Sequence, residues 1–185
     1  MERLVIATGN EGKVREFKEI LKGWTVTSMK EEGLAAEVEE TGTTFEENAR
    51  IKAIALAERL KAAGIYAIAI ADDSGMEVDA FGGGPGVYSA RYLGEKPPYE
   101  EKNRIILEKL RGVPEERRGA RYVCAIVAVW PEGKIRAAQA SCDGRIAQEA
   151  EGSGMTPSSM CRNSPKVWRN SRRKRRTKYP IEEKP

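Results

Sequence analysis

Short apolar runs alternate with longer periodic segments in the first half of the chain. Leu4–Ala7, Trp24–Met29 and Ala67–Ala71 have the length and apolar character of strands. Val14–Lys22 and Thr44–Lys61 repeat their apolar residues every three or four positions, which predicts two helices. Gly64 follows the second helix at the place where a helix commonly ends.

The second half continues this pattern. A glycine-rich loop at Gly82–Gly86 precedes a predicted helix at Tyr99–Leu110. Tyr122–Trp130 is rich in Val and Ile and predicts a strand, and Ile135–Cys142 is its expected hairpin partner across Pro131–Lys134. Strands that alternate with helices predict an α/β fold. The length of 185 residues fits one domain, or one domain divided into two lobes.

Composition narrows the possible chemistry. The chain is 40% apolar and 32% charged, which is typical of a globular protein. It has no histidine, which excludes Ser-His-Asp and Cys-His catalysis and any zinc site that needs imidazole. Its three cysteines are widely spaced and fit neither a disulfide framework nor a zinc site. We find no secretory signal, and the longest apolar run, Ile65–Ala71, is too short to span a bilayer. A cytoplasmic protein is therefore expected.

The polar loop after the first predicted strand is the first candidate site. It consists of Thr8, Gly9, Asn10, Glu11, Gly12 and Lys13. Successive amides at a glycine turn before a helix attract anions, and the Lys ammonium suits phosphate. The spacing is not that of a Walker loop, because the glycines are too close and Val14 follows the Lys. An ordinary strand–helix turn is the alternative.

Two acidic segments form the next candidates. Glu37, Glu39 and Glu40 precede a helix start, where clustered carboxylates suit a hard divalent cation; the alternative is a solvated loop with Thr43 or Thr44 as the helix N-cap. Asp72–Gly75 reads Asp-Asp-Ser-Gly directly after an apolar strand, and in open α/β sheets ligands bind at that end of the strands. Two adjacent carboxylates repel each other unless a positive charge such as Mg²⁺ lies beside them. A turn that ends the strand is the alternative.

Two cations complete the set of candidates. Arg91 follows the glycine-rich loop and could bind an oxyanion, and Lys52 lies on the long predicted helix. Taken alone, both residues are better explained as solvated surface charges.

The order and spacing of these segments resemble the non-canonical purine triphosphate pyrophosphatases, which include the inosine and xanthosine triphosphatases. The segments that carry the resemblance are Ala7–Glu16, Glu39–Ala49, Ala71–Ala80, Pro85–Tyr92 and Asp143–Ile146. The resemblance extends over Met1–Gly154.

The resemblance implies a fold, an activity and roles for individual residues. The fold is an elongated, mixed and twisted α/β sheet flanked by helices, with two lobes and a central cleft. The reaction hydrolyses ITP, dITP or XTP to the monophosphate and pyrophosphate with Mg²⁺. The Thr8–Lys13 loop, Lys52, Ser74 and Arg91 correspond to substrate-binding positions. Glu39, Glu40 and Asp73 correspond to the metal site, with either Glu as the ligand, and Asp73 also corresponds to the general base. A homodimer is implied, and neither nucleic acid nor a membrane is expected as a partner.

Met155–Pro185 departs from this pattern. It carries ten Lys/Arg and two Asp/Glu, a formal charge of +8, whereas the preceding 154 residues carry 22 and 26, a formal charge of −4. Such a tail typically binds nucleic acid. The family that the sequence resembles instead continues with a Gly-Phe-Gly-Tyr-Asp-Pro segment and a later Ser-His-Arg segment, neither of which follows Gly154. The resemblance implies that these segments recognise the purine and complete the site.

Reverse translation offers another explanation for the tail. When the last base of each codon is joined to the first two of the next, with allowed third bases and a T before the Met155 codon, Met155–Val167 can read Tyr-Asp-Pro-Ile-Phe-Tyr-Val-Pro-Glu-Phe-Ser-Lys-Ser. In the same frame, Lys178–Pro185 can read Ile-Ser-His-Arg-Gly-Lys-Ala. Both missing motifs occur in the right order. We therefore interpret 155–185 as a non-native, disordered frameshift product and expect little or no turnover by the chain as written. The alternatives are a nucleic-acid-binding protein and a nucleotide-binding module without turnover.

Overall fold

The computed structural model describes residues 3–92, 99–147 and 168–169. The strands are β1 (Arg3–Ile6), β2 (Thr25–Ser28), β3 (Ile68–Val78), β4 (Gly119–Val129), β5 (Ile135–Ile146) and β6 (Trp168–Arg169). The α-helices are α1 (Glu11–Ile20), α2 (Phe45–Ala62) and α3 (Tyr99–Lys109), and the 3₁₀-helices are η1 (Asp79–Phe81), η2 (Gly86–Tyr88) and η3 (Glu115–Arg117).

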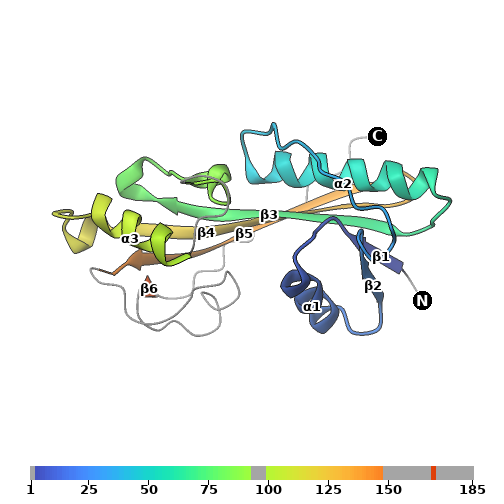
Figure 1. The fold of residues 1–185 in the computed structure, drawn as a ribbon, viewed down its shortest axis with the longest axis horizontal. Helices are drawn as coiled ribbons and strands as arrows, with labels where there is room; N and C mark the ends of the chain where they lie inside the picture. Colours follow the sequence, from blue (N-terminus) through green and yellow to red (C-terminus); the bar gives the residue numbers. More distant parts are fainter. Residues whose placement is uncertain (1–2, 93–98, 148–167, 170–185) are drawn as a thin grey trace. The chain divides into compact units, whose positions relative to one another are not determined.

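The described strands form one sheet in the order β2-β1-β3-β4-β5-β6 (Figure 1). β1 runs parallel to β2 and β3, whereas β5 and β6 are antiparallel, so the sheet is mixed. The predicted α/β class with flanking helices is confirmed. The chain divides into two compact units whose boundary lies within β3, between Asp73 and Ser74. Within the described residues, the first unit comprises 3–73 and 125–139, and the second comprises the remainder.

The first unit has helices on both faces of its strands (Figure 1). Leu4 and Ile6 of β1 and Ile68 and Ile70 of β3 pack in one cluster with Phe17 of α1. The intervening strand residues, Val5, Ala69 and Ala71, are also fully buried and point to the opposite face because side chains alternate along a strand. α2 lies on that opposite side and buries a stripe that includes Ala49, Ala53, Leu56 and Leu60.

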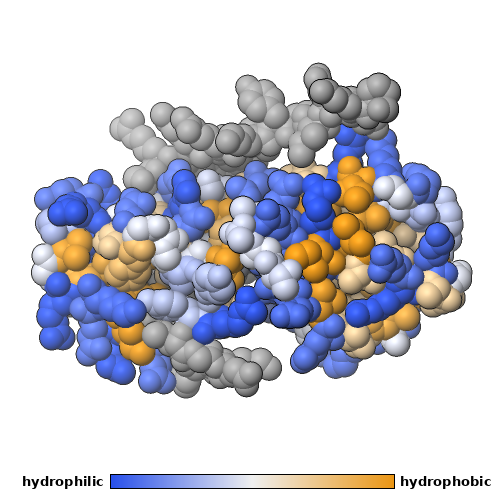
Figure 2. Space-filling model, turned by 90° about the horizontal axis from the view of Figure 1, so that it is seen from above, coloured by the Kyte–Doolittle hydropathy of each residue, from blue (hydrophilic) through white to orange (hydrophobic). Residues whose placement is uncertain are grey.

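The outward side of α2 is less strictly polar. Ile51 and Ile54 are half-buried. Figure 2, in which the molecule is seen from above, shows hydrophobic residues at the surface between hydrophilic ones. The two ends of α2 follow ordinary capping rules. Thr44 and Glu47 form a capping box, which confirms Thr44 over Thr43 as the N-cap. Gly64, with φ of 68°, ends the helix as the sequence predicts.

Two predicted boundaries that bear on the candidate site are wrong. α1 begins at Glu11, inside the predicted turn, because the Asn10 side chain caps the helix by accepting from the amides of Gly12 and Lys13. β3 does not end before the Asp72–Gly75 run but continues to Val78, so this run is neither a strand end nor a turn. The predicted hairpin is confirmed, since the Trp130 amide donates to the Lys134 carbonyl between β4 and β5.

The second unit has its own core. Val78, Ile106, Leu110, Ala120 and Ile146 form a buried cluster between β3, α3, β4 and β5. Of the 155–185 tail, the structure describes only the strand β6, which pairs with Arg145 and Ile146 of β5. The prediction that the tail is disordered falls otherwise on residues outside the described ranges. No helix in the described part of the chain is long and apolar enough to cross a bilayer.

Arg118 is the main polar group inside the second unit, where it is 4% exposed. Its guanidinium donates to the carbonyls of Leu110, Val113 and Ala147 at 2.6, 3.0 and 2.7 Å. Two of these carbonyls follow the C-terminus of α3, where a cation is favoured. The side chain therefore joins the end of α3 to the end of β5.

Replacing Arg118 with Met should lower the free energy of unfolding by about 3 kcal/mol, because the change removes three hydrogen bonds that join the end of α3 to the end of β5. Urea denaturation measures this loss. Arg111→Met is the matched control, since Arg111 is exposed nearby in the chain. An equal loss in both variants would contradict the role given to Arg118.

Candidate active site

The two adjacent aspartates of β3 point to opposite faces of the sheet. Side chains alternate along a strand, so Asp72 shares the face of Ile68 and Ile70, and Asp73 shares the face of Ala69 and Ala71. The expected repulsion between two carboxylates is therefore relieved by separation. Each aspartate is also paired with a lysine from a different helix.

Asp72 is paired on the α1 side. The Lys13 Nζ atom lies 2.5 Å from Asp72 Oδ2, and the Asp72 side chain is 8% exposed. Lys13 is in the first turn of α1, at the end of the candidate phosphate loop. This ion pair places the loop's cation beside β3.

Asp73 belongs to a second cluster on the α2 side. The Lys52 Nζ atom lies 3.0 Å from Asp73 Oδ1 and 2.8 Å from Glu40 Oε1, so one ammonium bridges two carboxylates. The amide of Asn48, one helical turn before Lys52, donates to Asp73 Oδ2 at 3.4 Å. Glu40, Asn48, Lys52 and Asp73 thus form a half-buried charged group, which we call the Lys52 cluster.

The pKa of Asp73 is raised above its usual value. Burial is the largest cause, and the charge of Glu40 adds to it, whereas Lys52 and the hydrogen bond from Asn48 lower the pKa. A carboxylate with a raised pKa is a better proton acceptor than a solvated one.

The candidate phosphate loop is partly capped by its own residues. The amides of Gly12 and Lys13 donate to Asn10 Oδ1, and the Asn10 amide donates to Thr8 Oγ1 at 3.1 Å. An anion bound at this loop would therefore lie beside the Asn10 side chain, which caps α1, and the Lys13 ammonium.

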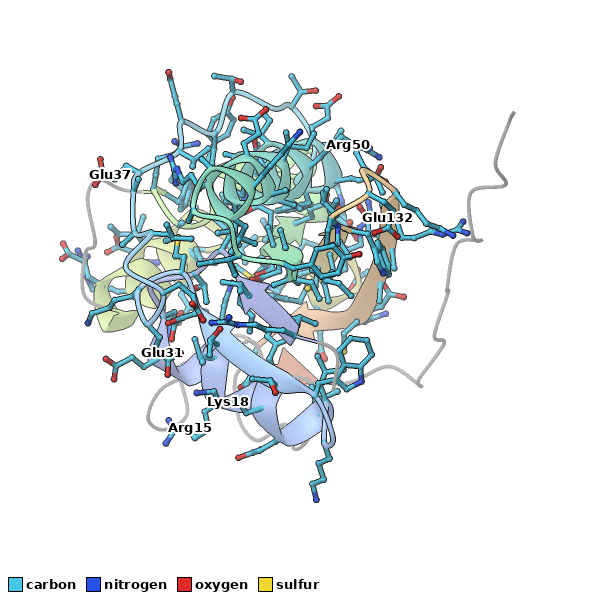
Figure 3. All side chains as sticks on the ribbon, turned by 90° about the vertical axis from the view of Figure 1, so that its right-hand side faces the viewer. Arg15, Lys18, Glu31, Glu37, Arg50 and Glu132 are labelled. Carbon is cyan, nitrogen blue, oxygen red and sulfur yellow. The ribbon has the colours of Figure 1, made fainter. Side chains whose placement is uncertain are left out.

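A pocket of about 760 Å³ adjoins the same loop. Thr8, Gly9 and Glu11 line it together with basic residues of α1. Figure 3 shows two of these, Arg15 and Lys18, on the outside of α1, with Glu31 near Lys18. Lys18 and Glu31 form an ion pair of 3.1 Å.

The three glutamates before α2 have different surroundings. Glu40 is half-buried in the Lys52 cluster, whereas Glu37 and Glu39 are exposed. Figure 3 shows Glu37 at the outer edge of the first unit. Glu37, Glu39 and Lys52 help to line a pocket of about 840 Å³ whose apolar lining includes Val38 and Leu56. The structure therefore brings Glu40, and not Glu39, together with Asp73.

The remaining predicted residues lie in the second unit. Ser74 is half-buried and follows Asp73 in β3. Arg91 is exposed after η2, with its guanidinium carbon 5.9 Å from the centre of the Tyr88 ring.

A family model matches residues 4–156, which is most of the chain, and describes the Ham1 family. The chain belongs to this family. A dITP/XTP pyrophosphatase of Desulforamulus reducens is 47% identical over 154 residues, which cover 82% of this chain and 74% of the relative. The dITP/XTP pyrophosphatase of Bacillus subtilis is 44% identical over 82% of this chain and 75% of its own.

Solved structures agree with this assignment to the Ham1 family. The Ham1 protein of Staphylococcus aureus has a TM-score of 0.73 and 37% identity, and covers 84% of this chain and 77% of its own. A nucleoside-triphosphatase / dITP/XTP pyrophosphatase of Mycobacterium abscessus has a TM-score of 0.68 and 35% identity, with 83% and 79% coverage.

The oxygen donors of this Ham1-family chain are of the kind that a hard divalent cation takes. Among the described residues, no three acidic or cysteine side chains converge as a complete metal cage. Mg²⁺ is usually held by one or two carboxylates together with substrate phosphates and water, and Glu40 and Asp73 supply such a pair. The donor set therefore suits a metal that arrives with a triphosphate.

One residue of the site escaped the sequence prediction. Asn48 is fully buried, although Asn is seldom buried. Its spacing was the available signal, since residues four positions apart share a helix face and Asn48 precedes Lys52 by four. A buried amide on the face of a candidate site lysine indicates a role in that site.

Proposed function

We propose that this chain is a pyrophosphatase that hydrolyses the non-canonical purine nucleoside triphosphates dITP, XTP and ITP to the monophosphate and pyrophosphate. The names of the curated relatives support this substrate class. The observation that carries the proposal is the Lys52 cluster, in which one lysine bridges the two carboxylates that suit a metal ligand and a general base. This cluster provides both acceptor oxygens and a cation for phosphoryl transfer.

In this proposal, each candidate residue has its own role in the reaction. Lys13 and the Thr8–Gly12 loop bind the triphosphate, and Lys52 neutralises charge on its oxygens as pyrophosphate leaves. Asp73 accepts a proton from the water that attacks the α-phosphorus, which its raised pKa favours. Glu40 and Asp73 would hold Mg²⁺, which when bound neutralises phosphate charge and lowers the pKa of water. Ser74 and Arg91 are proposed as further substrate contacts, and Glu39 as an alternative metal ligand.

The resemblance to the non-canonical purine triphosphate pyrophosphatases also suggests an oligomeric state and a cellular location. We propose that the family-type homodimer forms and that the enzyme works in the cytoplasm. Size-exclusion chromatography with light scattering tests the first, and a monomer would contradict it.

The tail remains a frameshift product in this proposal. The family match ends at residue 156, whereas about a quarter of each curated relative has no counterpart in the aligned part of this chain. Resequencing the gene across the Gly154 codon decides the matter. An intact reading frame, with the tail confirmed by intact mass, would refute it.

Nucleotide turnover tests the function. The chain as written and a completed chain, in which Met1–Gly154 is joined to the C-terminal remainder of the D. reducens relative, should be incubated with dITP, XTP, ITP, ATP and GTP plus Mg²⁺. Monophosphate and pyrophosphate from the first three, and little from ATP and GTP, are the expected products of the completed chain. Release of orthophosphate, or salt-sensitive nucleic-acid binding without turnover, would contradict the proposal.

A further inference from the structure

Asn48 is the most completely buried polar side chain in the Lys52 cluster, with no exposed surface. Its Oδ1 atom accepts from the Gly42 amide at 2.8 Å, and its Nδ2 atom donates to Asp73 Oδ2 at 3.4 Å. These partners fix which way the amide points, because the Gly42 N–H can only donate and an ionised carboxylate can only accept. A reversed amide would face both partners with the wrong group.

The Gly42 side of this contact is closely packed. A Cβ atom at Gly42 would lie 2.7 Å from Asn48 Oδ1 and 2.9 Å from the Asn48 amide nitrogen, so only glycine fits without movement. The next residues of the loop are anchored to the same helix end. Glu47 Oε2 accepts from the amides of Thr43 and Thr44 at 2.7 and 3.0 Å. The loop that follows Glu40 is thus attached to the first turn of α2.

The Asp73 side of the contact determines the plane of the carboxylate. Lys52 binds Oδ1 and Asn48 binds Oδ2, so each oxygen of Asp73 has a donor from α2. Asn48 and Lys52 are one turn apart on this helix. Each oxygen keeps a further lone pair for a metal ion or a water molecule.

We propose that Asn48 is a positioning residue that orients the Asp73 carboxylate and couples it to the loop carrying Glu40. One amide group joins both segments that provide the carboxylates, so the separation between the two carboxylates depends on it. This inference rests on the proposed function, because it assigns Asn48 to the metal and base site described there. Groups that orient ligand carboxylates typically change metal affinity by about 10- to 100-fold when they are removed.

Manganese binding by the full chain tests this role without requiring turnover. Mn²⁺ prefers the same oxygen ligands as Mg²⁺ and is detected directly by electron paramagnetic resonance. Asn48→Ala should weaken Mn²⁺ binding about 10- to 100-fold. Glu47→Ala is the matched control, because it removes the loop anchor from the same helix turn and leaves Asn48 and Asp73 in place. Thermal denaturation of both variants shows how much fold stability each change costs.

The comparison between the two variants decides the outcome. A large loss of Mn²⁺ affinity in Asn48→Ala, with a small loss in Glu47→Ala at a similar melting temperature, supports positioning. Equal losses in both variants would overturn the proposal, since loop order alone would then explain the site. An unchanged Mn²⁺ affinity in Asn48→Ala would also overturn it, because the metal site would then not depend on this amide.

A second measurement applies even if the unchanged chain binds no Mn²⁺, a result that would contradict the metal part of the proposed function. In the metal-free protein, the NMR resonances of the Asn48 side-chain NH₂ should shift on Asp73→Asn and stay in place on Glu47→Ala. Resonances that ignore Asp73→Asn would overturn the inference, whereas the expected shift would support it independently of the metal.

Discussion

Asp73→Asn should lower the rate of pyrophosphate release from dITP by the completed chain by about 10²- to 10⁴-fold. The change keeps the size of the side chain but removes its charge and its ability to accept a proton. It also removes one of the two carboxylates bridged by Lys52. Steady-state kinetics with saturating Mg²⁺ measures the effect, and the loss should fall on kcat, because a general base acts in the transition state.

The neighbouring residue provides an unusually close comparison for this prediction. Asp72→Asn makes the same chemical change one residue earlier, on the opposite face of the sheet, where the carboxylate is paired with Lys13. We expect its loss of kcat to be at least about tenfold smaller, because the Asp72 carboxylate, on the opposite face, does not accept the proton from water. Equal losses in the two variants would contradict the assignment of the base to Asp73.

The sequence predicted the types of the elements better than the extent of β3. Regular apolar spacing and capping residues locate α2 to within one residue at each end, since both signals are local. Asp and Gly are poor strand formers, so the Asp72–Gly75 run seemed to end the strand. In the structure it is held in β3 by its neighbours in the sheet and by Lys13 and Lys52, which are distant in sequence.

The contrast between local signals and contacts that are distant in sequence also explains which parts of the site the sequence predicted. Motif order identified Lys13, Lys52, Glu40 and Asp73 as candidates, and the structure places three of these in one cluster. Motif order could not choose between Glu39 and Glu40, because adjacent residues in an irregular loop have no fixed periodicity. It also could not show that the adjacent aspartates work on opposite faces, since that follows only once the strand is known to continue through them.

Joining Met1–Gly154 to the C-terminal remainder of the D. reducens relative should raise kcat/KM for dITP by about 10²- to 10⁴-fold over the chain as written. The first 154 residues contain the Lys52 cluster and the phosphate loop, but binding energy from the purine is also needed to lower the barrier at phosphorus. The segments implied to recognise the purine are the ones missing from 155–185.

A truncated chain ending at Gly154 is the control, because it separates loss of the native segments from interference by the +8 tail. If the truncated chain matches the completed one, the tail inhibits an otherwise sufficient site. If all three chains are equally active on dITP, the residues after Gly154 contribute nothing to substrate recognition, and the frameshift has no functional consequence.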